Sequence, residues 1–140
     1  MANQMTPEKR LKSIRNWMAM ADYDLETAKH MLKTGRYIYV VFMCHLSLEK
    51  MIKAHVEMAE GKFPPKIHDL ETLAQRAELT IPSPLNKIIL ELNKASIPTR
   101  YPEDLQRSLA DYSKKYCSRV LKETRETLQW LKTHPRLSNL

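Results

Sequence analysis

The chain has 140 residues, of which 43% are hydrophobic and 28% are charged, a composition typical of a folded domain and not of a disordered or low-complexity segment. Its formal net charge is +7, which favours anionic partners such as nucleotides or RNA but locates no site. The longest apolar run, Tyr37 to Cys44, is far shorter than the roughly 20 residues that cross a bilayer, and no signal-peptide pattern opens the sequence. We therefore expect a soluble, cytoplasmic protein with no membrane partner.

Two long helices are predicted in the first part of the chain. Thr6 is suited to cap a helix over residues 7–33, along which apolar residues recur at steps of three and four. Gly35 ends this helix. The next helix covers about 37–60, and its first half is apolar on all sides, which is typical of the central helix of a bundle.

Two short helices are predicted after these. The first follows a proline-containing connector and covers about 69–77, with its leucines and alanines on one face. The second begins at Pro84, with Ser83 as its cap.

The last predicted helix is long and covers about 102–133. Its apolar residues lie near one face, although Asp111 or Ser113 can cap a restart midway. No segment alternates like a half-buried strand. The sequence therefore predicts an all-α fold, an antiparallel up-and-down helical bundle of three long helices plus two short ones, in a single domain over residues 1–140.

The connector over residues 96–104, SIPTRYPED, holds Arg100 and Tyr101 between two prolines. Each proline disfavours the helical conformation in the residue before it, so we expect Ile97 and Tyr101 to be extended and Arg100 to lie on a stiff connector. Arginine offers a planar fork for phosphate, and tyrosine offers a flat face for a base. The alternative is that Arg100 pins the connector through a neighbouring carboxylate.

The second predicted helix carries a polar stripe of Glu49, Lys53, Glu57 and Glu60, and one turn before this stripe stands His45. We expect His45 to mark the boundary between a solvated face and a buried one. Glu49, four residues on, could orient its ring for acid–base chemistry near neutral pH. The alternative is a boundary histidine bonded to another helix.

His68 and Asp69 stand side by side, as in His-Asp metal phosphohydrolases, but that chemistry needs further ligands from other helices. Cys44 and Cys117 lack metal-ligand spacing, and we expect them to be reduced thiols that pack in the core. No metal and no cofactor are therefore expected. His68 or Asp69 is expected to cap the short helix.

Four stretches of the chain resemble, in order, those of the HEPN domain family. They are NWMAMADYDLETAKHML, GRYIYVVFMCHLSLEKMIKAH, HDLETL and TRYPE, and together they extend over most of the chain. The resemblance implies an antiparallel helical bundle, commonly a homodimer, whose prokaryotic members often act beside a minimal nucleotidyltransferase in toxin–antitoxin-like pairs. It also implies a nucleotide-binding set, which here comprises His45, Glu49, Lys50, His68, Arg100 and Tyr101.

Many members of this family are metal-independent RNases that carry Arg, four to six residues, and then His. This sequence lacks that motif, because eight residues separate Arg36 from His45 and eight separate Arg125 from His134. The RNase activity is therefore not carried over, and enzymatic activity stays an open question. We expect a nucleotide-binding subunit, with ATP or a similar nucleotide as ligand. The alternatives are an RNase that uses a non-standard Arg/His pair and a helical interaction module without a ligand.

Overall fold

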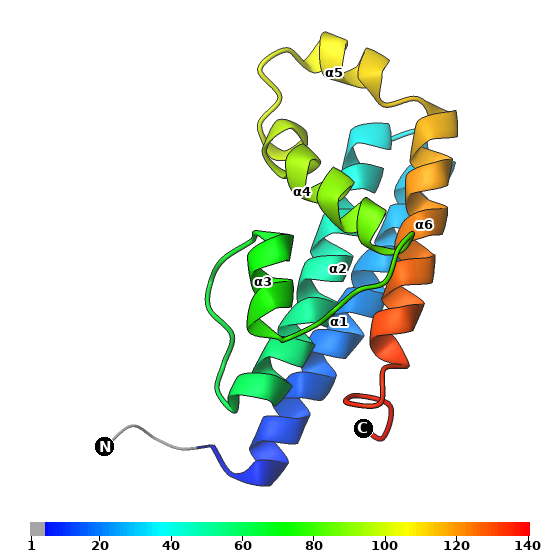
Figure 1. Ribbon diagram of the computed structural model, residues 1–140. Coiled ribbons are helices and arrows are strands. Elements are labelled where there is room, and N and C mark those ends of the chain that lie inside the picture. The colour runs from blue at the N-terminus through cyan, green and yellow to red at the C-terminus, as the bar shows by residue number, and fades with distance from the viewer. Residues whose placement is uncertain (1–4) are drawn as a thin grey trace.

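The computed structural model describes residues 5–140 and shows an all-helical protein over that range. Helix α1 runs antiparallel to α2 and α6 along the long axis, α3 and α4 lie against α2, and α5 stands at the far end (Figure 1). The all-α bundle with three long helices is confirmed. The bounds are α1 Pro7–Lys33, α2 Tyr37–Glu60, α3 Leu70–Arg76, α4 Asn86–Arg100, α5 Leu105–Asp111 and α6 Lys114–Lys132.

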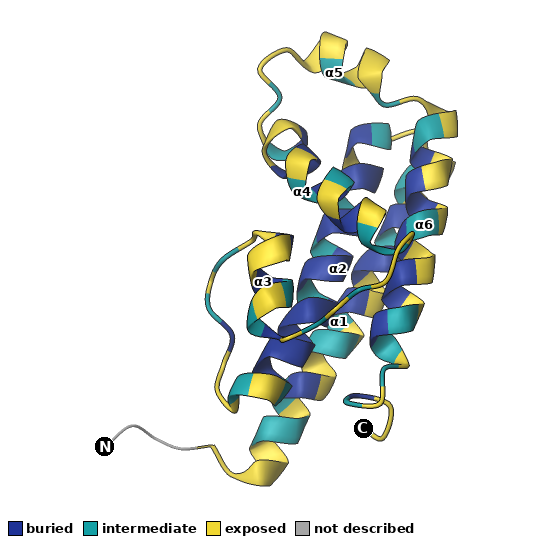
Figure 2. Cartoon of the chain, viewed as in Figure 1, coloured by how far each residue is buried: buried dark blue, intermediate teal, exposed yellow. Residues whose placement is uncertain are grey.

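Helix α2 is the centre of the bundle. It contacts five other helices, and most of its residues are buried (Figure 2). Its apolar side chains join those of α1, α4 and α6 in one core, to which Val40, Leu48 and Ile52 contribute without any exposed surface. In the described part of the chain, no helix combines the length and hydropathy needed to span a membrane.

Side-chain caps define the starts of several helices, as the sequence predicts for α1 and α3. Thr6 Oγ1 accepts a hydrogen bond from Lys9 N (3.2 Å), and Asp69 Oδ1 accepts one from Thr72 N (2.8 Å) at the start of α3. The prediction that His68 or Asp69 caps the short helix is thus confirmed for Asp69. Helix α4 begins two residues after the predicted start, at Asn86, and has no side-chain cap at its first turn.

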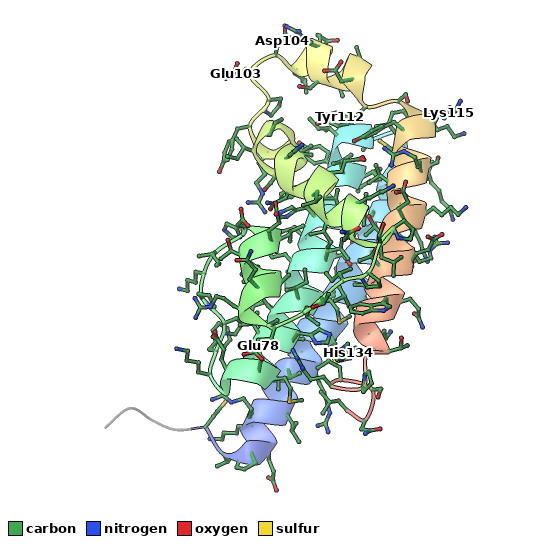
Figure 3. The ribbon with its side chains drawn as sticks, viewed as in Figure 1. Glu78, Glu103, Asp104, Tyr112, Lys115 and His134 are labelled. Atoms are coloured by element: carbon green, nitrogen blue, oxygen red, sulfur yellow. The ribbon has the colours of Figure 1, made fainter. Side chains whose placement is uncertain are left out.

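The predicted last helix is interrupted, so the described residues contain three shorter helices instead of two. Its first part is α5, which ends at Asp111, and a new helix begins after Ser113, whose hydroxyl accepts from Tyr116 N (3.1 Å). The restart at Ser113 is one of the two predicted alternatives. No residue of α5 is buried, whereas α6 buries a full apolar stripe (Figure 2). The labelled Glu103 and Asp104 mark the end of the molecule where α5 begins, far from His134 (Figure 3).

The prediction of an extended connector around Arg100 is wrong. Helix α4 continues through Pro98 and includes both Ile97 and Arg100, and only Tyr101 leaves it, with φ −134° and ψ 68°. A proline inside a helix lacks one backbone hydrogen bond. Packing of α4 on α2, with Thr99 on the buried face, offsets this loss. The Thr99 hydroxyl also donates to Ala95 O (2.7 Å). Arg100 therefore occupies the last turn of a helix packed on α2.

Candidate functional site

A buried carboxylate, Glu49, is the centre of the candidate site. Its exposed fraction is 4%. Oε2 accepts hydrogen bonds from His68 Nδ1 (3.0 Å) and Lys53 Nζ (3.1 Å). Oε1 lies 3.7 Å from Arg100 Nη2 and 3.6 Å from His45 Nδ1. The guanidinium and both imidazoles of the predicted set are therefore gathered around one acid.

Three segments position these side chains. His45, Glu49 and Lys53 follow one another on successive turns of α2, so they share a face of that helix. His68 comes from the connector immediately before α3. Arg100 reaches the cluster from the last turn of α4, with its guanidinium carbon 5.2 Å from the centroid of the Phe42 ring.

The polar stripe on α2 is buried from Glu49 to Glu57, and only Glu60 at its end is partly exposed, which corrects the prediction of a solvated face. Lys53 is 6% exposed and Glu57 is fully buried, so His45 does not mark a boundary with water. Helix α1 covers Glu57, since Arg10, Ser13 and Trp17 all donate to its carboxylate. A buried charge is stable when it is paired and hydrogen-bonded, and Glu57 satisfies that condition through both oxygens and Glu49 through Oε2.

A hollow of about 260 Å³ opens beside the cluster. Its lining comes from the two residues before α3 and from the second half of α4, and consists of His68, Asp69, Asn93, Ser96, Ile97 and Arg100. Glu49 and His45 are not part of this lining, because they lie behind His68 and Arg100 and are almost fully buried. The side chains of His68 and Arg100 are 57% and 18% exposed, so both can meet a ligand.

Several polar atoms behind the hollow lack a hydrogen-bond partner. Within residues 5–140, both ring nitrogens of His45, Oε1 of Glu49 and Nε of Arg100 are buried and unpaired. Buried polar groups in proteins are nearly always hydrogen-bonded, and exceptions cluster at functional sites. The cluster therefore places, next to the hollow, buried polar atoms without a side-chain partner among the described residues.

Burial and pairing set the charges of the cluster. Burial lowers the pKa of His45 to about 4, against the opposing effect of Glu49, so this imidazole is neutral near pH 7. Burial alone would raise the pKa of Glu49, but the hydrogen bonds and charges of His68 and Lys53 together lower it. Glu49 is therefore ionised near pH 7, and Lys53 supplies a positive charge next to it.

Two of the predicted site residues lie outside this cluster. Lys50 Nζ binds Asp24 Oδ2 (2.6 Å) and joins α2 to α1. Tyr101 is 74% exposed and lines a second hollow of about 430 Å³ between α4 and α5. The two hollows share one lining residue, Ile97.

No group of three His, Cys, Asp or Glu residues is placed to hold a metal ion in the part of the chain that the structure describes. The side chains of His68 and Asp69 make hydrogen bonds to different parts of the protein. His68 faces Glu49, while Asp69 caps α3 and accepts a second hydrogen bond, from Asn93 Nδ2 (3.2 Å).

Five residues of the site are not among the predicted set, namely Lys53, Asp69, Asn93, Ser96 and Ile97. Lys53 stands in the polar stripe four residues after Glu49, and that spacing could have identified it as a partner. Asn93 Oδ1 accepts from Leu70 N (2.8 Å) and thereby joins α3 to α4 at the wall of the hollow, and Ser96 lies one turn further along α4. Nothing in the local sequence marks these two residues, because the wall forms only when α3 packs on α4.

Comparisons with known proteins agree with this architecture. A family model described as "HEPN domain" matches residues 14–134. The protein TT1696 from Thermus thermophilus has a similar crystal structure, with a TM-score of 0.70 and 23% identity over 85% of this chain and 95% of that chain. The structure of ST0689, described as an archaeal HEPN homologue, gives a TM-score of 0.67 and 23% identity over 85% of this chain and 94% of that one. No curated protein matches the chain.

Proposed function

Because the chain belongs to the HEPN domain family, we propose that it is a nucleotide-binding helical subunit whose Arg100 holds the phosphate of the ligand. In this proposal the subunit works in the cytoplasm beside a minimal nucleotidyltransferase, in a toxin–antitoxin-like pair. The RNase motif of the family is absent from the sequence.

The observation that carries the proposal is the state of the Arg100 guanidinium. Arg100 lines the 260 Å³ hollow, and its single ion pair in the described residues is the 3.7 Å approach to Glu49, which is too long for a hydrogen bond. Its Nε is unpaired as well. A partly buried guanidinium with free donors is suited to bind a phosphate in bidentate fashion.

The neighbouring hollow supports a place for the base. The ligand would lie with its phosphate at Arg100 and His68 and with its base across Ile97 toward Tyr101, whose exposed ring offers a stacking face. From behind the hollow, the neutral His45 and the ionised Glu49 would support the position of Arg100 and His68. Lys50 has no place in this arrangement because it pairs with Asp24.

Calorimetry tests the nucleotide proposal. We expect ATP, GTP or AMP to bind the wild type and Arg100→Ala to weaken binding at least about tenfold, since a charge-assisted bidentate contact contributes more than about 1.4 kcal/mol. Arg125→Ala is the matched control, because Arg125 is exposed on α6 and has no ion pair among the described residues. No heat with any nucleotide on the wild type counts against the proposal.

The apolar end of the bundle supports a protein partner. Five large apolar side chains are exposed at or near the α4–α5 end, namely Tyr39, Ile97, Tyr101, Leu105 and Leu109. Exposed apolar groups that gather in this way mark interaction surfaces. We propose a homodimer and a nucleotidyltransferase complex that use the part of this end formed by Tyr39, Leu105 and Leu109, which leaves Ile97 and Tyr101 to the nucleotide. Sedimentation of the chain alone, and with any minimal nucleotidyltransferase found in the neighbouring reading frame, tests both, and a monomer in both experiments contradicts them.

One observation favours a second candidate, a metal-independent RNase. Glu49 accepts from Nδ1 of His68, which orients the half-exposed ring as in histidines that act as general bases, and Arg100 lines the same hollow. His45 is unsuited to that role because it is 1% exposed. Cleavage of single-stranded RNA in EDTA, abolished by His68→Ala, would support this candidate, and uncut RNA would remove it. If the RNA is uncut and calorimetry also detects no nucleotide binding, the remaining candidate is an interaction module without a ligand.

A further inference from the structure

Lys53 is a charged residue inside the bundle that is not part of the lining of the 260 Å³ hollow. It is 6% exposed, and its ammonium group has one hydrogen-bonded partner among residues 5–140, Glu49 Oε2 at 3.1 Å. Removing a charge from water is costly unless a close counter-charge offsets it. Glu49 is the one hydrogen-bonded partner of this buried lysine within residues 5–140, so we look for the role of Lys53 in its effect on Glu49.

The ammonium group is also held by Trp17. Nζ lies 5.6 Å from the centroid of the indole ring, and indole Nε1 donates to Glu57 Oε1 (3.1 Å), which fixes the orientation of the ring. Phe63, in the connector that leads to His68, packs on the same indole, with its ring centroid 5.4 Å from that of Trp17. Lys53 thus has little freedom to leave Glu49.

The charges of Glu49, Lys53 and Arg100 show how Lys53 affects the hollow that Arg100 lines. Glu49 carries one negative charge, and Lys53 and Arg100 each carry one positive charge. If Lys53 neutralises Glu49, the positive charge of Arg100 is available to a ligand. The distances agree with this, because Lys53 lies 3.1 Å from Oε2 of Glu49 whereas Arg100 lies 3.7 Å from Oε1. Without Lys53, the attraction between Glu49 and Arg100 would increase, because the pair lies in a region of low dielectric constant. Arg100 would then form a direct hydrogen-bonded ion pair with Glu49 and offer less to a phosphate.

We propose that Lys53 is a positioning residue that neutralises Glu49 from behind and so keeps Arg100 and His68 available to the anionic ligand. This inference rests on the proposed nucleotide binding, but part of its test is independent of any ligand.

The test uses AMP as the probe and compares variants by calorimetry. Lys53→Met should weaken AMP binding roughly tenfold although Lys53 lines no part of the hollow. The double variant Lys53→Met/Glu49→Gln removes both charges and frees Arg100 again, so it should bind AMP at least about threefold more tightly than Lys53→Met. A merely structural role of Lys53 would not be repaired by removing its partner as well. Lys132→Met, which removes an exposed lysine paired with Asp22, is the charge-matched control and should change the affinity less than about twofold.

A ligand-free readout is the ionisation of Glu49, followed by carbon-detected NMR of its carboxyl group. Lys53 lowers the pKa of Glu49 through both its charge and its hydrogen bond, so Lys53→Met should raise that pKa. Should Lys53→Met fail to fold, Lys53→Gln keeps a donor without the charge and should also weaken AMP binding. Wild-type affinity in the single variants, or a double variant as weak as Lys53→Met, overturns the inference. Absence of AMP binding to the wild type would instead count against the proposed function, and the pKa of Glu49 would still decide the role of Lys53.

Discussion

Replacing Glu57 with glutamine should destabilise the fold by about 3 kcal/mol. Three donors converge on this fully buried carboxylate, Arg10 Nη1 (2.8 Å), Ser13 Oγ (2.8 Å) and Trp17 Nε1 (3.1 Å). A hydrogen bond to a charged group contributes about 1.5–3 kcal/mol and one between neutral groups about 0.5–1.5 kcal/mol. Glutamine keeps one acceptor oxygen, so the bond from Arg10 to Oε2 is lost, while the bonds from Ser13 and Trp17 to Oε1 weaken to neutral ones. The lower end of the resulting range is expected, because the Arg10 side chain is 20% exposed and can turn toward water.

Urea unfolding followed by far-UV circular dichroism at pH 7 measures this loss, which corresponds to roughly 10 °C in the midpoint of thermal unfolding for a chain of this size. Glu123→Gln is the matched control. Glu123 also binds an arginine, Arg119 (2.6 Å), but the side chains of that pair are 34% and 45% exposed, and its loss should cost below about 1 kcal/mol. A loss for Glu57→Gln no larger than that of the control would refute the reasoning that this buried carboxylate holds α1 on α2.

Three further predictions concern pH, a helix start and the thiols. Burial lowers the pKa of both His45 and His55 to about 4, so the unfolded state binds more protons between that value and about 6.5, and stability should fall as the pH drops through this window. A His55→Gln variant whose stability depends on pH as steeply as that of the wild type would contradict this. Ser113→Ala should cost about 1 kcal/mol through loss of the α6 cap, whereas Ser113→Asp should retain stability in the same urea titration. Burial raises the pKa of Cys44 to about 12 and of Cys117 to about 11, so the native thiols should react with Ellman's reagent at least ~100-fold more slowly than the denatured ones, and equal rates would show that the thiols are accessible.

The sequence predicts most of the helical framework because the relevant signals are local. The Thr6 cap, the glycine stops and the all-round apolar character of residues 37–48 each act within one or two turns, and the structure follows them. Pro98 shows the limit of local reasoning. Its disfavoured place inside a helix is stabilised by the buried face of α4 on α2, and a contact between distant segments cannot be read from the neighbours of a proline.

The same limit applies to the candidate site. Sequence spacing places His45, Glu49 and Lys53 on one face of a helix, and that face exists. Spacing does not show that α1 and α3 cover this face, so it predicts a solvated stripe where the structure has a buried, ion-paired row. Spacing also fails to show that Arg100 and Tyr101, which are adjacent in the chain, line different hollows. Arg100 is the last residue of α4, and Tyr101 follows the helix.

The segment α5 is the part of the protein that the core constrains least, since none of its seven residues is buried. A helix of this length is marginal in isolation, and what defines its start here is the Asp104 side chain, which accepts from Arg107 N (3.2 Å). Substitutions on its surface therefore carry little penalty in folding free energy. Natural variation can accumulate in α5 without disturbing the core, and a fluorescent label or an epitope inserted there should leave the rest of the architecture intact.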